Sequence, residues 1–249
     1  MTDMADQAQE SVATAEGPGD GSPGLHFQIP SEFHEIPLAI GNDESAHERQ
    51  LEQFAQGYWG GRDDLAPLRE LTKTLYAVTT QDLVAGGTVY SAFGIYPMGG
   101  DLNGSQPPER ISRAALTISV REMENPDPYF TAAGIAETLE KAPDTEGSEV
   151  QPVSLRAGPA VVRIVGSRMV WELQEGDLER FSVRIEVWLP FPHDDKVLLL
   201  CMSTPDVEDL LHYQGILADI ANSVRFGEDS PTNQQVTPSS SGASPFSSY

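Results

Sequence analysis

Histidine, cysteine and acidic side chains are the groups of this sequence that could carry metal-binding or proton-transfer chemistry. The histidines lie far apart along the chain, and no two have the i, i+4 spacing of a helical metal pair. They are His26, His34, His47, His193 and His212. The one cluster with the character of a ligand set is His193-Asp194-Asp195, where two carboxylates follow the histidine and could hold a divalent cation weakly. Its position between two predicted strands favours a solvated hairpin turn, so we expect no metal site.

The only cysteine, Cys201, lies within the apolar run 197–202. A single cysteine excludes an intramolecular disulfide and a cysteine-rich zinc site. A cysteine in such a run usually packs as a small hydrophobic residue, because a thiol in apolar surroundings keeps its proton and reacts slowly. We therefore expect Cys201 to be buried rather than to act as a nucleophile.

None of the paired glycines of the sequence belongs to a motif for nucleotide binding, and none of its serines stands in a motif for nucleophilic catalysis. Glycine pairs at 60–61, 86–87 and 99–100 fit neither G-x-G-x-x-G nor a P-loop. There is no G-x-S-x-G elbow. His34 and Glu35 could pair as a base and its orienting group, but the sequence offers no obvious nucleophile motif for them. We expect no enzymatic activity and no cofactor. A hydrolase whose residues converge only in the fold stays an alternative, because triads assemble from distant residues.

Three aromatic residues are candidates for a binding surface. Tyr58 and Trp59 end a predicted helix beside two glycines, where they could line a groove. Trp188 has the opposite parity to Val187 and Leu189, so we expect it on the other face of its strand. In a sandwich both faces are covered, which favours packing of Trp188 under a helix. An exposed Trp188 would instead mark a binding surface.

The charge of the chain restricts its partners. Lysine and arginine number 15 against 38 aspartate and glutamate residues, which gives a formal charge of −23. Such a field repels phosphate backbones and anionic membrane surfaces, so we expect no nucleic-acid partner and no binding to lipid headgroups. A protein partner with a basic face fits this charge, and so does a role in solubility alone.

Composition divides the chain of 249 residues into one domain and two tails. Residues 1–24 are acidic and rich in glycine, alanine and serine, and residues 228–249 are rich in serine and proline. Both segments are therefore predicted to be disordered. Residues 25–227 form a single predicted domain. The N-terminus lacks the basic start of a signal peptide, and no apolar stretch approaches the roughly twenty residues that span a bilayer. We expect a cytoplasmic protein without membrane insertion, and leave unconventional export open.

Periodicity and capping signals predict helices at 44–59, from Asp63 onward, at 128–141 and after Pro205. The second carries Leu65, Leu68, Leu71, Leu75 and Val78, an apolar stripe of the kind that faces a core. Asp127 is the expected N-cap of the third and Thr204 that of the last, each followed by proline at the first helical position.

Strands are predicted where apolar and polar residues alternate. The expected segments are 25–29, 89–95, 114–120, 153–157, 159–166, 169–174 and 181–189, with 196–202 apolar on both faces and therefore central. Helices first, an antiparallel sheet in the middle and a closing helix predict an α+β fold. We expect an α/β/α sandwich with a mostly antiparallel central sheet flanked by helices.

The C-terminal part of the sequence resembles a known family. Gly158-Pro159-Ala160 enters a strand, a long hairpin and an apolar strand follow, and Ser203-Thr204-Pro205 precedes a helix that ends at 220–226. Over residues 110–227 this pattern is similar to the Mog1/PsbP-like family and, within it, to LpqN-type actinobacterial proteins. The resemblance implies an antiparallel sheet flanked by helices and a non-enzymatic role, such as binding a small GTPase or assisting a photosystem. Unlike the LpqN lipoproteins, this chain shows no lipidated cysteine.

Three functions follow as hypotheses. The first is a non-catalytic protein-interaction domain, an adaptor or accessory factor of an assembly or secretion system. The second is a small-molecule or lipid-binding module with a pocket between the sheet and the N-terminal helices near Tyr58 and Trp59. Such a pocket should be concave and mostly apolar. The third is the hydrolase described above.

Overall fold

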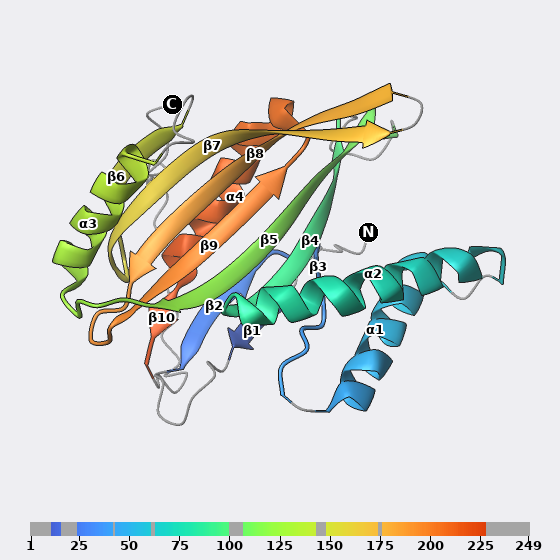
Figure 1. Ribbon diagram of the computed structural model, residues 1–249, viewed down its shortest axis with the longest axis horizontal. Coiled ribbons are helices and arrows are strands. Elements are labelled where there is room, and N and C mark those ends of the chain that lie inside the picture. Colours follow the sequence, from blue (N-terminus) through green and yellow to red (C-terminus); the bar gives the residue numbers. More distant parts are fainter. Residues whose placement is uncertain are drawn as a thin grey trace, which may run out of the picture.

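A computed structural model describes residues 11–15, 24–41, 43–60, 63–99, 107–142, 148–173 and 176–227. Its centre is a seven-stranded sheet in which every neighbouring pair is antiparallel (Figure 1). The spatial order is β3 (Phe33–Glu35), β4 (Thr88–Met98), β5 (Arg110–Glu122), β9 (Lys196–Thr204), β8 (Gly176–Pro190), β7 (Gly158–Leu173) and β6 (Glu149–Leu155). The predicted α+β class is confirmed.

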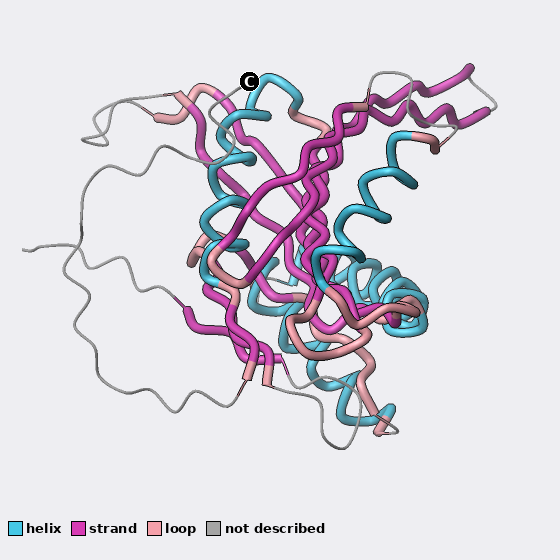
Figure 2. The backbone as a smooth tube through the Cα atoms, turned by 90° about the vertical axis from the view of Figure 1, so that its left-hand side faces the viewer, coloured by secondary structure: helices cyan, strands magenta, loops and turns pink. Residues whose placement is uncertain are grey.

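Helices pack against both faces of this sheet (Figure 2). The last helix, α4 (Leu210–Ser223), follows a short 3-10 turn, η2 (Val207–Asp209), and covers one face together with the strand Leu25–Ile29. The opposite face carries α3 (Pro128–Glu140) at one end. At its other end lies a hairpin of α1 (Glu44–Trp59) and α2 (Ala66–Ala85), joined through η1 (Asp63–Leu65). Within the described residues no helix is long and apolar enough to cross a membrane.

A small second sheet pairs strands of the N-terminal region with the short strand that follows α4. Its middle strand is β2 (Leu25–Ile29), flanked by β1 (Ser11–Ala15) and β10 (Arg225–Phe226). The sequence predicted disorder over 1–24, but Ser11–Ala15 pairs with β2, whose open edge offers unpaired backbone groups. The rest of that predicted tail, apart from Gly24, and all of 228–249 lie outside the described residues.

The main core fills the space between the sheet and α4. Residues of β5, β8 and β9 point into it with a period of two, as alternating strands require. Its fully buried members include Leu116, Ile118, Ile185, Val187, Leu198, Leu200, Tyr213, Leu217 and Ile220. Strand β9 is buried on both faces, since Val197 packs with α3 while Leu198 packs with α4. The prediction of a central strand at 196–202 is confirmed.

The residues that precede α4 do not form the N-cap that the sequence predicted. The Thr204 hydroxyl donates to the Arg113 carbonyl at 2.7 Å and accepts from the Asp206 backbone N–H at 3.0 Å. It therefore ties the end of β9 to β5, and the chain passes through η2 before α4 begins at Leu210. The assignment of Thr204 as the N-cap of the last helix was wrong, because its hydroxyl closes a turn upstream of the helix.

A carboxylate in η2 fastens the α4 face. Asp209 is buried and accepts two hydrogen bonds from the Arg110 guanidinium at the start of β5. One turn further on, the Tyr213 and Ser112 hydroxyls hydrogen-bond at 2.7 Å. The hydrogen bonds from Arg110 hold the pKa of Asp209 at about 2. These contacts fix the start of α4 against β5.

Strand β7 is longer than predicted. The sequence suggested separate strands at 159–166 and 169–174, but β7 pairs with β8 without a break from Gly158 to Leu173. Small and polar residues at 166–168 interrupt the apolar pattern without interrupting the hydrogen-bonded ladder. Gly166 also leaves room for the Phe181 ring, which a side chain at this position would meet at 2.6 Å.

Candidate binding groove

The α1–α2 hairpin is held together by contacts at its closed end. The Trp59 indole N–H donates to the Thr72 hydroxyl at 2.8 Å, and the Arg69 guanidinium donates to the Gly60 carbonyl at 2.8 Å. The Lys73 ammonium lies 3.2 Å from a Glu52 carboxylate oxygen and bridges the two helices further along. The hairpin is therefore a fixed unit, and Trp59 has a structural partner within it.

An aromatic cluster attaches this hairpin to one edge of the sheet. The Phe93 ring of β4 lies 5.1 Å from that of Tyr58 and 5.9 Å from that of Phe54, both in edge-to-face geometry. The His34 ring of β3 lies 5.3 Å from the Phe93 ring, in a tilted orientation. Such pairs add specific geometry to the burial of apolar area. These contacts attach the hairpin to β4, and α2 extends from there along the sheet face opposite α4.

An apolar cavity of about 590 Å³ lies between α2 and the sheet. Its walls come from α1, α2 and strands β4, β5, β8 and β9. Apolar and aromatic side chains dominate the lining, among them Phe54, Tyr58, Trp59, Leu71, Leu75, Tyr76, Phe93, Ile95, Ala115 and Phe181. This volume falls within the range of small-molecule sites. Two of the three predicted site residues, Tyr58 and Trp59, therefore lie on one cavity wall.

The apolar stripe of α2 faces this cavity and is largely exposed. Leu71 is 64 % and Leu75 is 60 % exposed, and both line the cavity. Leu68 and Val78 continue the stripe and are exposed as well. Four-residue spacing places Leu71 and Leu75 on the same side of the helix. The stripe was predicted correctly, but not its exposure, because α2 stands off the sheet over this stretch.

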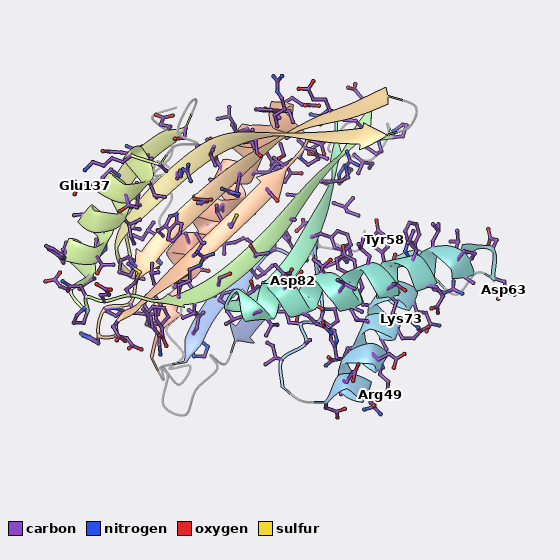
Figure 3. The ribbon with its side chains drawn as sticks, viewed as in Figure 1. Arg49, Tyr58, Asp63, Lys73, Asp82 and Glu137 are labelled. Carbon is purple, nitrogen blue, oxygen red and sulfur yellow. The ribbon has the colours of Figure 1, made fainter. Side chains whose placement is uncertain are left out.

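A second cavity of about 400 Å³ lies further along the same sheet face and is more polar. It is lined by Asp82, Leu83, Gly86, Thr88, Thr117, Ser119, Arg121, Arg163, Arg184, Glu186, Trp188, Leu199 and Cys201. Helix α2 borders both cavities, Leu71 the first and Leu83 the second, a separation of roughly 18 Å at 1.5 Å per residue. Figure 3 labels Tyr58 near the apolar end and Asp82 near the polar end. We call the two cavities together the α2 groove.

The polar end is organised around Glu186, which is buried. Glu186 stands opposite Arg163 in the β7–β8 ladder, and an Arg163 Nη1 lies 3.8 Å from its carboxylate. The Arg184 Nε contacts the other carboxylate oxygen, and the Trp188 indole N–H donates to Glu186 at 3.2 Å. A buried carboxylate requires such partners, because desolvation without them is costly. Glu186 therefore holds Arg163, Arg184 and Trp188 together at the polar end.

Trp188 packs under a helix, as the sequence favoured, and is not the exposed residue of the alternative prediction. It lies on the opposite sheet face from Val187 and Leu189, as its parity predicted. It is half-buried, packs against the cluster under α3 and also lines the polar end of the groove. The Arg121 guanidinium lies 5.8 Å from the centroid of its ring. The structure thus brings Trp188 to the same groove as Tyr58 and Trp59, at the other end.

Cys201 also lines the polar end and is partly buried, whereas the sequence predicted a buried residue. Burial and, secondarily, the neighbouring Glu186 raise the pKa of its thiol to about 12. Arg184 and Arg121 act in the opposite direction but do not outweigh burial. The thiol stays protonated near neutral pH, which agrees with the prediction that it is no nucleophile.

The remaining polar candidates do not converge on the groove. His193, Asp194 and Asp195 lie in the turn after β8, where Asp194 pairs with Lys196 at 3.2 Å. In the described part of the chain, no three histidine, cysteine or acidic side chains gather where a metal ion could bind. The pKa of Glu35 is raised by burial.

The sequence matches no protein-family model and no curated protein. The relation to the Mog1/PsbP-like family therefore stays a prediction from the order of elements in residues 110–227.

Proposed function

We propose that this protein is a non-catalytic binding module whose α2 groove takes up an apolar small molecule or lipid. The observation that carries the proposal is the apolar cavity of about 590 Å³ beneath a helix with exposed leucines. Large apolar patches on monomers usually mark interaction sites, and a concave apolar site with few polar groups suits a small ligand. A flat protein interface would not need a concave site of this volume.

The energetics support an occupant of this groove. Burying a leucine side chain completely contributes about 1.5–3 kcal/mol. Leu71 and Leu75 line the cavity and are each about three-fifths exposed, so covering them contributes on the order of 2–4 kcal/mol. The Tyr58 and Phe93 rings of the cavity wall already pack against each other, which lowers the cost of ordering the site.

Titration with the neutral dye Nile red tests this proposal. We expect saturable binding with one dye per chain and a change in tryptophan emission, because Trp59 lines the cavity. Leu75→Glu should weaken binding at least tenfold, since it places a charge in the apolar lining. Leu211→Glu is the matched control, because Leu211 is also an exposed helical leucine (69 %) but lies on α4.

Both variants should unfold at the wild-type temperature, because surface substitutions usually change stability by less than about 0.5 kcal/mol. Equal dye affinity in the wild type and Leu75→Glu would refute the groove as a binding site.

The second candidate is the protein-interaction domain that the sequence suggested first. It is favoured by Tyr129 and Phe130, which are 75 % and 69 % exposed at the start of α3. Exposed aromatic side chains are typical anchors of interfaces, and the acidic chain suits a basic partner. A crosslinked pull-down should then give one stoichiometric partner that Tyr129→Ser with Phe130→Ser abolishes and that high salt weakens. A partner retained by the double variant would rule out this surface.

A further inference from the structure

We propose that the α2 groove binds a long-chain carboxylate, with its chain under α2 and its carboxylate at Arg121 and Arg184. This inference rests on the proposed function, because it names the chemical class of the ligand of that groove. The occupant is a single-chain amphiphile taken from solution, rather than a membrane surface or a protein.

The first argument is the charge of the polar end. Arg121, Arg163 and Arg184 line it, against the carboxylates of Glu186 and Asp82. The chain as a whole has 15 basic and 38 acidic residues, so a site with more basic than acidic side chains runs against the general composition. Guanidinium groups bind carboxylates in a planar, two-point geometry, which makes an anionic head group the complementary ligand.

The second argument is that these three arginines differ in burial and in partner. Arg163 is buried and lies directly opposite Glu186, so these two form the floor of the polar end. The Arg184 side chain is 42 % exposed, and Arg121 is exposed as well. Arg121 lies over the Trp188 ring, and a cation–π contact does not use the N–H groups as hydrogen-bond donors to an acceptor, so they can still donate to a ligand. Arg121 and Arg184 are thus the two cations placed to meet a ligand.

The third argument is that the apolar and polar ends adjoin along three strands. On β8, Ser182 lines the apolar cavity and Arg184 the polar one; on β9, Ser203 and Cys201 do the same. On β5 the change comes between Ala115 and Thr117. Each step is two residues, about 6.6 Å along a strand. One extended chain can therefore lie in the apolar end with its head group at Arg184.

The same charges predict selectivity. The net charge of −23 repels small anions, so a short carboxylate gains too little from Arg184 to bind. A long apolar chain supplies the missing affinity by covering Leu71 and Leu75. A cationic amphiphile would meet the guanidinium groups directly, which disfavours it despite the acidic surface elsewhere.

The experiment compares three ligands of equal chain length on the full chain: palmitate, hexadecanol and hexadecyltrimethylammonium, each below its aggregation limit. Binding is followed by displacement of Nile red and by native mass spectrometry. We expect palmitate to bind at least tenfold more tightly than hexadecanol, and the cation to bind more weakly than both. Acetate at millimolar concentration should displace nothing.

Arginine variants locate the head group. Arg184→Gln and Arg121→Gln should each weaken palmitate about tenfold and leave hexadecanol unchanged. Arg184→Gln keeps the Arg163–Glu186 pair, so Glu186 retains a cation. Arg121→Gln alters an exposed side chain and offers a second variant if Arg184→Gln does not fold. Arg156→Gln is the control, because it changes the net charge equally in the β6–β7 turn, outside the groove.

The outcomes separate this inference from the proposed function. Equal affinity for palmitate and hexadecanol, or palmitate binding unchanged in both arginine variants, would overturn the carboxylate and leave an apolar groove. Preference for the cationic amphiphile would overturn it as well. If neither palmitate nor hexadecanol binds and Nile red does not bind, the groove itself fails as a ligand site.

Discussion

The two faces of the sheet differ in how completely the apolar side chains of their helices are buried. On one face, α4 buries Tyr213, Leu217 and Ile220 completely against β5, β8 and β9. On the other, α2 leaves Leu71 and Leu75 largely exposed above a cavity. The α4 face therefore supplies stability, whereas the groove face leaves apolar surface uncovered. On the proposed function, the ligand site lies where a predicted core contact is not made.

The largest expected difference is in the cost of truncating a leucine on each face. Leu217→Ala removes a fully buried side chain and should lower the free energy of unfolding by about 2–5 kcal/mol. Leu75→Ala should change it by less than about 0.5 kcal/mol, because Leu75 is mostly in water. Urea unfolding of both variants measures the difference. Similar losses would mean that α2 packs on the sheet as α4 does.

A smaller effect is expected from the carboxylate that fastens the α4 face. Asp209→Asn should cost about 2 kcal/mol at neutral pH, because it breaks the pair with Arg110. The pKa of Asp209 is about 2 in the folded protein, below that of an unfolded aspartate near 3.9. Its contribution is therefore complete above about pH 4 and is lost as the pH falls toward 2.

The difference in unfolding free energy between the wild type and Asp209→Asn should accordingly shrink between pH 4 and 2. The control is Glu137→Gln, which alters an exposed carboxylate paired with Lys141 on α3 (Figure 3) and should have no measurable effect. A difference that stays constant down to pH 2 would contradict the assigned pKa.

The smallest effect is expected at the polar end of the groove. Trp188→Phe keeps most of the ring under α3 but removes the hydrogen bond to Glu186, and should cost about 1 kcal/mol. Thermal unfolding measures it. A loss above about 3 kcal/mol would show that Trp188 belongs to the core rather than to the groove.

Local signals in the sequence were sufficient for most elements. The helix at 44–59 is α1 residue for residue, and Asp127 caps α3 by accepting from the Tyr129 and Phe130 backbone N–H groups. The run 196–202 lies within β9, in the middle of the sheet. Capping and periodicity depend on neighbouring residues only, so they can be recognised without knowing the fold.

The exposure of α2 was not predictable in this way. Its leucines have the same helical spacing as the apolar residues of α4, and spacing alone does not show which stripe is covered. The outcome depends on where the hairpin is anchored, which the Trp59–Thr72 bond and the contact of Tyr58 with Phe93 decide. These contacts join residues from separate elements, and composition does not reveal them.

The arginine cluster was missed for a related reason. Arg163 faces Glu186 because of the register of β7 and β8, which the predicted break near residue 167 obscured. A signal was present: Arg163 interrupts an apolar run, and Arg184 and Glu186 share the parity of Trp188. Charges that alternate onto one face of a mostly buried sheet indicate a partner for that face.

Native mass spectrometry of the protein purified from its own cells tests the central claim most directly, because a groove ligand with a buried chain should survive gentle desolvation. We expect one bound species with the mass of a long-chain carboxylate, present in the wild type and in Leu211→Glu and absent from Leu75→Glu. Ligand-free spectra for all three proteins, together with no binding of added Nile red, would contradict a ligand-binding groove beneath α2.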